Sequence, residues 1–144
     1  ADAACAAGDF EGGLQLYDEA LTLDPTYVAA RSNRAACHFA SGSLKACVKD
    51  CDLALDEIAD CRNGGKNHPI VLSLPVDERR LVMFYITTIS RRGAARYSLG
   101  DREGATFDLE KALKCAKDNA WSGLVEEITK DLSKLKETDK DTEE

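Results

Sequence analysis

The feature that most constrains this chain is an internal repeat with a step of 34 residues. The segment Gly8-Asp9-Phe10 recurs as Gly42-Ser43-Leu44, and the pair Ala20-Leu21 recurs as Ala54-Leu55. A fixed period of this length is typical of stacked helical hairpins, because one hairpin cannot bury its apolar face alone and must pack against the next. The repeat therefore predicts a helical solenoid.

A third copy of the pattern follows after an insertion. The segment Gly100-Asp101-Arg102 lies 58 residues after Gly42-Ser43-Leu44, which is one repeat plus 24 residues. The same step relates Asn33-Arg34-Ala35-Ala36 to Arg91-Arg92-Gly93-Ala94. Glycines recur at helix ends, where a left-handed residue terminates the helix. We expect an all-α fold, an α-solenoid of three helix pairs plus a C-terminal capping helix.

The predicted layout is one domain over residues 1–136, with repeats at about 1–25, 26–59 and 77–117. The stretch 60–75 is rich in helix breakers, which predicts an insertion loop. Apolar residues between Trp121 and Leu135 recur at gaps of three and four, which predicts an amphipathic helix that caps the solenoid. The predicted segments are the end of a helix at 1–7, helices at 9–23, 26–40, 43–59, 77–99 and 101–117, the capping helix at 119–136 and a disordered acidic tail at 137–144.

The charge of the chain argues against two classes of partner. Its formal net charge is −7, whereas a general nucleic-acid binder or a protein held on an anionic membrane needs a basic surface. No apolar run approaches the ~20 residues that a membrane helix requires. We therefore expect neither nucleic acid nor a membrane as a partner.

The residue pattern predicts neither catalysis nor a bound metal. The six cysteines form no Cys-x-x-Cys pair, and neither histidine completes a closed zinc site. The simplest interpretation is that the cysteines are small buried core residues in a reducing compartment, so we expect a cytoplasmic location. Because catalytic and nucleotide-binding motifs are missing too, we predict that the protein is not an enzyme and carries no cofactor.

The 34-residue unit, with Gly8-Asp9-Phe10, Ala20-Leu21 and Asp24-Pro25 at fixed spacing, resembles the tetratricopeptide repeat over about residues 1–117. The resemblance implies that the first helices of the pairs line a concave groove that binds a peptide of another protein. One class of the family holds the acidic C-terminal tails of cytosolic heat-shock chaperones in this groove. It does so with a lysine and an asparagine, a second asparagine, and a lysine and an arginine from three successive first helices. A terminal carboxylate needs such cations and amide donors at fixed positions.

Transferred residue by residue, the resemblance points to five candidate groove residues in this chain. Asn33 matches the second asparagine, and Arg91 matches the arginine. Asp2 stands where the first asparagine is expected, and Thr87 stands where the later lysine is expected. Arg80 shares a helical stripe with Thr87 and Arg91, so it either supplies part of the missing charge or is an ordinary solvated residue.

A narrower resemblance implies a cellular role. Three stretches are similar to the C-terminal repeat domain of the dynein axonemal assembly factor of the dyslexia-candidate type. They are Asn33 to Phe39, the later Cys47-x-x-Asp50-Cys51, and Arg91-Arg92-Gly93 after a long insertion. That resemblance implies a cytoplasmic, co-chaperone-like factor for preassembling ciliary dynein arms, with heat-shock chaperones and dynein assembly factors as partners. The alternatives are a structural scaffold that uses its convex face or its insertion loop while the groove stays empty, and a regulatory domain of a larger enzyme.

Overall fold

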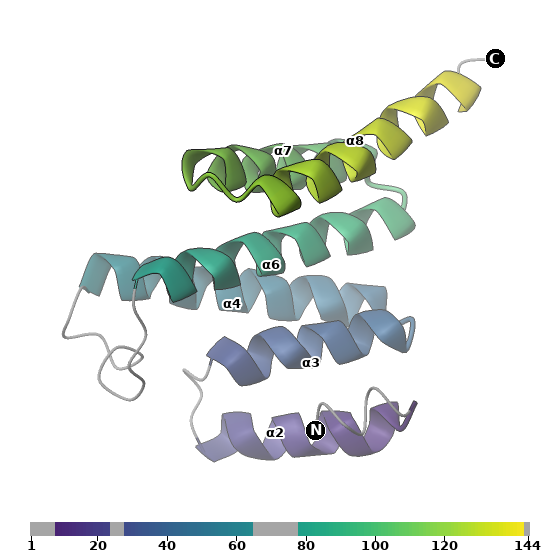
Figure 1. The fold of residues 1–144 in the computed structure, drawn as a ribbon. Coiled ribbons are helices and arrows are strands. Elements are labelled where there is room, and N and C mark those ends of the chain that lie inside the picture. Colours follow the sequence, from purple (N-terminus) through teal and green to yellow (C-terminus); the bar gives the residue numbers. More distant parts are fainter. Residues whose placement is uncertain (1–7, 24–27, 65–77, 143–144) are drawn as a thin grey trace.

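The structure is a computed structural model that describes residues 8–23, 28–64 and 78–142, and in those ranges every regular element is a helix. Each helix packs against the next along the chain, and α3 also contacts α6. Helices α3, α6 and α8 form one layer, with α4 and α7 behind them (Figure 1). The predicted all-α solenoid is confirmed. The helices are α2 (Phe10–Leu23), α3 (Val28–Ala40), α4 (Leu44–Gly64), α6 (Glu78–Ser98), α7 (Arg102–Asp118) and α8 (Ser122–Thr142).

The turn between α6 and α7 shows why a Gly-Asp pair recurs in the sequence. Gly100 has a φ of 90°, in the left-handed region that favours glycine. The N–H of Asp101 then donates to the carbonyl of Arg96 at 2.8 Å, which satisfies one of the free carbonyls at the end of α6. The Asp101 side chain also caps α7, because its Oδ1 accepts a hydrogen bond from the N–H of Gly104 at 3.0 Å. One dipeptide therefore ends one helix and begins the next.

The turn between α7 and α8 has the same geometry without a glycine. Ala120 has a φ of 57°, and the N–H of Trp121 donates to the carbonyl of Ala116 at 3.0 Å. A non-glycine residue in this region strains the folded state by roughly 1–2 kcal/mol. A glycine has no such strain, but it lowers the free energy of unfolding by about 0.4–1 kcal/mol because it raises the conformational entropy of the unfolded chain. We expect Ala120→Gly to raise the free energy of unfolding by about 0.5–1 kcal/mol in urea titrations. Gly100→Ala should lower it, and a loss of stability in Ala120→Gly would contradict this account.

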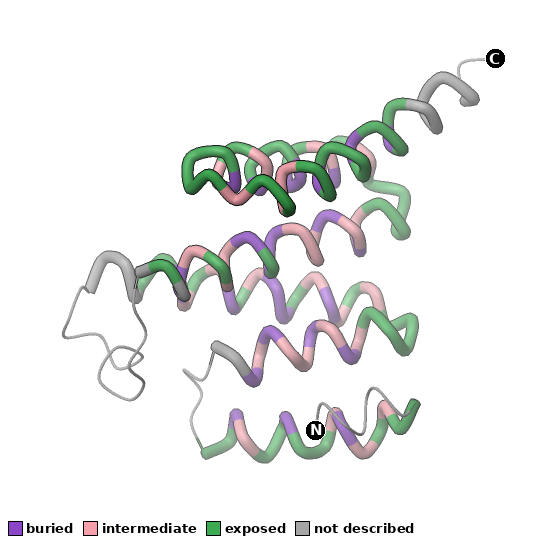
Figure 2. The backbone as a smooth tube through the Cα atoms, in the orientation of Figure 1, coloured by how far each residue is buried: buried purple, intermediate pink, exposed green. Residues whose placement is uncertain are grey.

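Buried residues recur on the sides of the helices that face one another (Figure 2). Between α3, α4 and α6 the core consists of small residues, which let the helix axes approach closely. Cys47 and Cys51 belong to this cluster and are fully buried, as the sequence predicted. Cys37 is disulfide-bonded, which the cysteine pattern did not predict. The larger cluster between α6, α7 and α8 is built on Ile86, Ile89, Ala105, Leu109, Ala112, Ala116, Ile128, Leu132 and Leu135.

The structure differs from the sequence prediction at the end of α4 and at both ends of α8. The capping helix begins at Ser122 and not at residue 119, because Ala120 takes the left-handed conformation of a turn. Helix α4 continues to Gly64, although the insertion loop was expected to start at residue 60, and α8 continues to Thr142, where a disordered tail was expected. Extending an existing helix is easier than starting one, and the Lys and Glu residues of the tail are good helix formers even without apolar neighbours. The predicted helix end at 1–7 and most of the predicted loop lie outside the described residues. No described helix is both long and apolar enough to cross a membrane.

Candidate functional site

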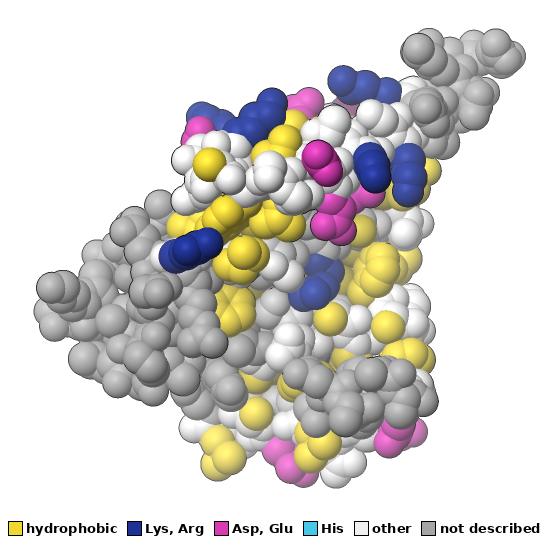
Figure 3. Space-filling view, in the orientation of Figure 1, with side chains coloured by type: hydrophobic (Ala, Val, Ile, Leu, Met, Phe, Trp, Pro, Cys, Tyr) yellow, Lys and Arg dark blue, Asp and Glu magenta, His cyan; other side chains and the backbone are white. Residues whose placement is uncertain are grey.

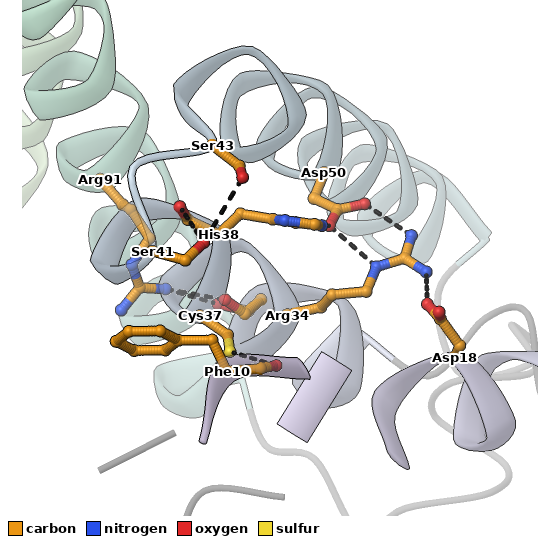
Figure 4. Close-up of polar contacts among 10 residues, drawn as sticks. Phe10, Asp18, Arg34, Cys37, His38, Ser41, Ser43, Asp50 and Arg91 are labelled. Atoms are coloured by element: carbon orange, nitrogen blue, oxygen red, sulfur yellow. Dashed lines mark hydrogen bonds and ion pairs between the residues drawn. The ribbon is translucent and has the colours of Figure 1, made fainter. Parts of the chain in front are cut away.

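Arg91 joins two helices of the front layer. It is half-buried on α6, and its Nη1 donates to the backbone carbonyl of Ser32 on α3 at 2.9 Å and to the Ser32 hydroxyl at 3.3 Å. Figure 4 shows the guanidinium reaching across to α3. Its Nε and Nη2 make no hydrogen bond to any residue in the described ranges. The arrangement therefore fixes a cation in place and leaves donors for a ligand.

Of the other candidates from the sequence, Asn33 lies next to this contact. The carbonyl that Arg91 binds belongs to the peptide unit joining Ser32 to Asn33. Asn33 is half-buried, and its amide has no hydrogen-bond partner among the described residues. Thr87 is exposed on α6, one helical turn before Arg91. The side chain of Arg80 and all of Asp2 lie outside the described residues.

Two adjoining hollows of about 370 and 250 Å³ lie on the face formed by α3, α6 and α8. We call the two together the groove. Phe39, Ser90, Ala94 and Asp131 line both hollows, and the larger one also contains Thr87 and Arg91. On this face, hydrophobic side chains gather around α6 and α8, bordered by basic and acidic ones (Figure 3). The groove therefore offers an apolar floor beside the fixed cation.

Helix α8 supplies groove residues that the sequence analysis missed. Glu127 and Asp131 are exposed, lie one turn apart and line the same hollow as Arg91. The apolar period of this segment predicted a capping helix and no groove residues. Because Glu127 precedes the buried Ile128 directly and Asp131 follows it by three positions, the same period places both carboxylates beside the buried stripe.

Comparison with known proteins agrees with this geometry. Residues 4–63 match the sequence profile of the family described as "Tetratricopeptide repeat". The first repeat domain of Spaghetti (RPAP3), solved with the HSP90 peptide SRMEEVD, superposes with a TM-score of 0.67 at 24% identity, over 94% of this chain and 83% of that one. The first such domain of human RPAP3 gives a TM-score of 0.61 at 22% identity, over 94% and 88%. The fold is a tetratricopeptide-repeat solenoid.

Sequence relatives include proteins that are named for chaperones. Hsc70-interacting protein 1 of Drosophila melanogaster is 28% identical over 139 residues, which cover 95% of this chain and 30% of that protein. Hsp70-Hsp90 organizing protein 2 of Arabidopsis thaliana is 36% identical over 58 residues, 40% of this chain and 10% of that protein. The chain thus spans less than a third of the length of these relatives.

In the α3–α4 pair and in the α6–α7 pair, one arginine bonds to residues of two other helices. Arg34 on α3 donates to both carboxylate oxygens of Asp50 on α4, at 2.8 and 2.7 Å, and to Asp18 on α2 at 2.6 Å. Figure 4 shows Arg34 held between the two aspartates. The hydrogen bonds to Asp50 raise the pKa of Arg34, so the guanidinium stays charged. This interaction is structural, because its donors already have acceptors.

The same arrangement recurs one copy later. Arg92 on α6 donates to both oxygens of Asp108 on α7, at 3.0 and 2.8 Å, and to Asp52 on α4 at 2.8 Å. Burial opposes the charge on Arg92, but the hydrogen bonds from its side chain to Asp108 and Asp52 hold its pKa above the ordinary value. Arg92 is thus an interhelix ion-pair residue. Arg91 and its neighbour Arg92 therefore contact different helices: Arg91 bonds to α3 and lines the groove, and Arg92 bonds to α4 and α7.

The buried cysteines and Trp121 pack in the core and form no second candidate site. The side-chain interaction with Cys47, together with burial, raises the pKa of the Cys51 thiol, which disfavours the reactive thiolate. In the described ranges, no group of three His, Cys, Asp or Glu residues could hold a metal ion. Trp121, just before α8, packs against the core cluster of α6, α7 and α8. The guanidinium carbon of the exposed Arg79 lies 5.8 Å from the centroid of its ring. The groove is therefore the candidate binding site of the described residues.

Proposed function

We propose that this domain binds the C-terminal peptide of a heat-shock chaperone in the groove, with Arg91 and Asn33 holding the terminal carboxylate. The observation that carries the proposal is the geometry of the Arg91 guanidinium. Its Nη1 is bonded to Ser32, while Nε and Nη2 have no acceptor among the described residues. A carboxylate accepts such donors in strong charge-assisted hydrogen bonds. The relatives named for Hsc70 and for Hsp70 and Hsp90, and the neighbour solved with an HSP90 peptide, support the choice of partner.

The geometry suits this task because the cation is organised before the peptide arrives. The bond to Ser32 fixes the Arg91 side chain, so little further conformational entropy is lost on binding. Phe39, which is 37% exposed, and Ala94 then offer apolar contact to a peptide side chain. Thr87 supplies no charge at the position where the resemblance implies a lysine. We therefore expect binding that is weaker than that of a domain with both cations.

The test is a titration of the labelled peptide SRMEEVD followed by fluorescence anisotropy. A hydrogen bond to a charged group contributes about 1.5–3 kcal/mol, so Arg91→Ala should weaken binding by roughly 10- to 150-fold. The same peptide with an amidated C-terminus should lose a comparable amount. Lys114→Ala removes an exposed cation of α7 that does not line the groove, and it should bind like the wild type. Thr87→Lys should tighten binding, and indifference of the affinity to Arg91 would remove this proposal.

The finer role that we propose is that of a cytoplasmic co-chaperone or adaptor in preassembly of dynein arms. It rests on the sequence similarity around Asn33, Asp50 and Arg91 alone. Co-purification of full-length protein with dynein assembly factors from ciliated cells would test it, and wild-type dynein arms in cells that lack the protein would contradict it.

A scaffold function is the second candidate, and one feature favours it. Phe107 on α7 is 52% exposed, and the Lys111 ammonium lies 4.4 Å from its ring centroid. Its helix, α7, lies in the layer behind α6 and α8 (Figure 1). If the convex face recruits the partner, Phe107→Ala should abolish capture of the partner while Arg91→Ala leaves it unchanged.

A further inference from the structure

The two carboxylates on α8 give the groove a second charged wall. Glu127 and Asp131 are exposed and line the hollow that contains Arg91, and Asp131 extends into the adjoining hollow. Neither forms an ion pair with a residue in the described part of the chain. The hollow is thus lined by a fixed cation on α6 and by two carboxylates on α8 that have no cation partner among the described residues.

A uniformly acidic peptide matches only half of this charge pattern. Its terminal carboxylate is attracted to Arg91, but further acidic side chains that lie along α8 meet like charges. Lys134 lines the smaller hollow, one turn beyond Asp131. It already interacts with another group and does not line the larger hollow. The larger hollow contains Glu127, Asp131 and Arg91 as its charged lining residues. The wall formed by α8 therefore favours a positive side chain there.

We infer that the groove selects peptides that carry a basic side chain upstream of the terminal carboxylate, with Glu127 and Asp131 receiving that side chain. This inference rests on the proposed function, because the terminal carboxylate at Arg91 sets the position of the peptide. Phe39 and Ala94 line both hollows and offer apolar contact to the peptide residues between the two charges. In this arrangement α8 sets specificity in addition to capping the core.

The experiment compares the heptapeptide SRMEEVD with a version whose arginine is replaced by glutamate, at low salt and at high salt. An exposed ion pair changes affinity by up to about 5-fold, so two carboxylates together should favour the arginine peptide by roughly 5- to 20-fold. Because the pairs are exposed, the preference should shrink at 0.5 M salt, where the Debye length is about 4 Å. In the double variant Glu127→Lys and Asp131→Lys the preference should vanish or reverse.

The matched control is Glu126→Lys, since Glu126 is exposed on the same helix but lines neither hollow. It changes the net charge as Glu127→Lys does, and it should leave the preference for arginine intact. If the wild type binds both peptides equally while Arg91→Ala still abolishes binding, this inference is wrong and the proposed function stands. If neither peptide binds, both fail. Equal weakening of both peptides by the double variant would also overturn the inference.

Discussion

Asp108→Ala is expected to lower the free energy of unfolding by about 3–5 kcal/mol, since breaking a buried ion pair leaves an uncompensated charge. Asp108 is 0% exposed and accepts hydrogen bonds from Arg92, at 3.0 and 2.8 Å, and from Arg96 at 3.0 Å. Its removal leaves two guanidinium groups at the interface of α6 and α7 without their buried acceptor. Urea denaturation followed by circular dichroism measures the loss.

The repeat supplies the controls for this experiment. Asp52 also binds Arg92, at 2.8 Å, but its side chain is 49% exposed. An exposed ion pair contributes about 0–1 kcal/mol, so Asp52→Ala should cost little. Asp50, the counterpart of Asp108 in the preceding copy, is buried and should behave like Asp108. Equal losses from Asp52→Ala and Asp108→Ala would show that burial does not decide the energy of these pairs.

Ile128→Ala is expected to cost about 2–5 kcal/mol, the range for truncating a buried isoleucine and leaving a cavity. Ile128 is 3% exposed and belongs to the cluster that joins α8 to α6 and α7. Because α8 covers the open end of the solenoid, its loosening should expose α7 first. Hydrogen exchange should therefore show faster exchange in α7 than in α3, along with a lower melting temperature.

The comparison variant for Ile128 is Lys130→Ala, on the exposed side of the same helix. A surface change of this kind usually alters stability by less than about 0.5 kcal/mol. If Ile128→Ala is as stable as Lys130→Ala, then α8 does not cap the core as described.

The parts of the fold that follow from local rules could be predicted from the sequence. The 34-residue step, the small residues at the helix contacts and the left-handed glycines each reflect a steric requirement that repeats with the structure. Ala120 occupies the same left-handed conformation without a glycine, so no pattern marked it. The ends of α4 and α8 were placed too early, because the cost of a few weak residues is small once a helix has started.

The groove depends on contacts between distant segments, and the sequence predicted it only in part. The resemblance pointed to Arg91, but the tether to Ser32 requires knowing how closely α6 approaches α3. The carboxylates of α8 were overlooked because a surface acid looks the same in sequence whether it faces solvent or lines a groove. The different roles of Arg91, which lines the groove, and Arg92, which pairs with Asp108, likewise depend on the position of α7 relative to α6.

The most direct test of the account is a crystal structure of the domain bound to SRMEEVD. The account predicts the terminal carboxylate of the peptide within hydrogen-bond distance of the guanidinium of Arg91 and the amide of Asn33, with the peptide lying between α3, α6 and α8. A peptide bound over Phe107 on α7, with Arg91 still bonded only to Ser32, would contradict it.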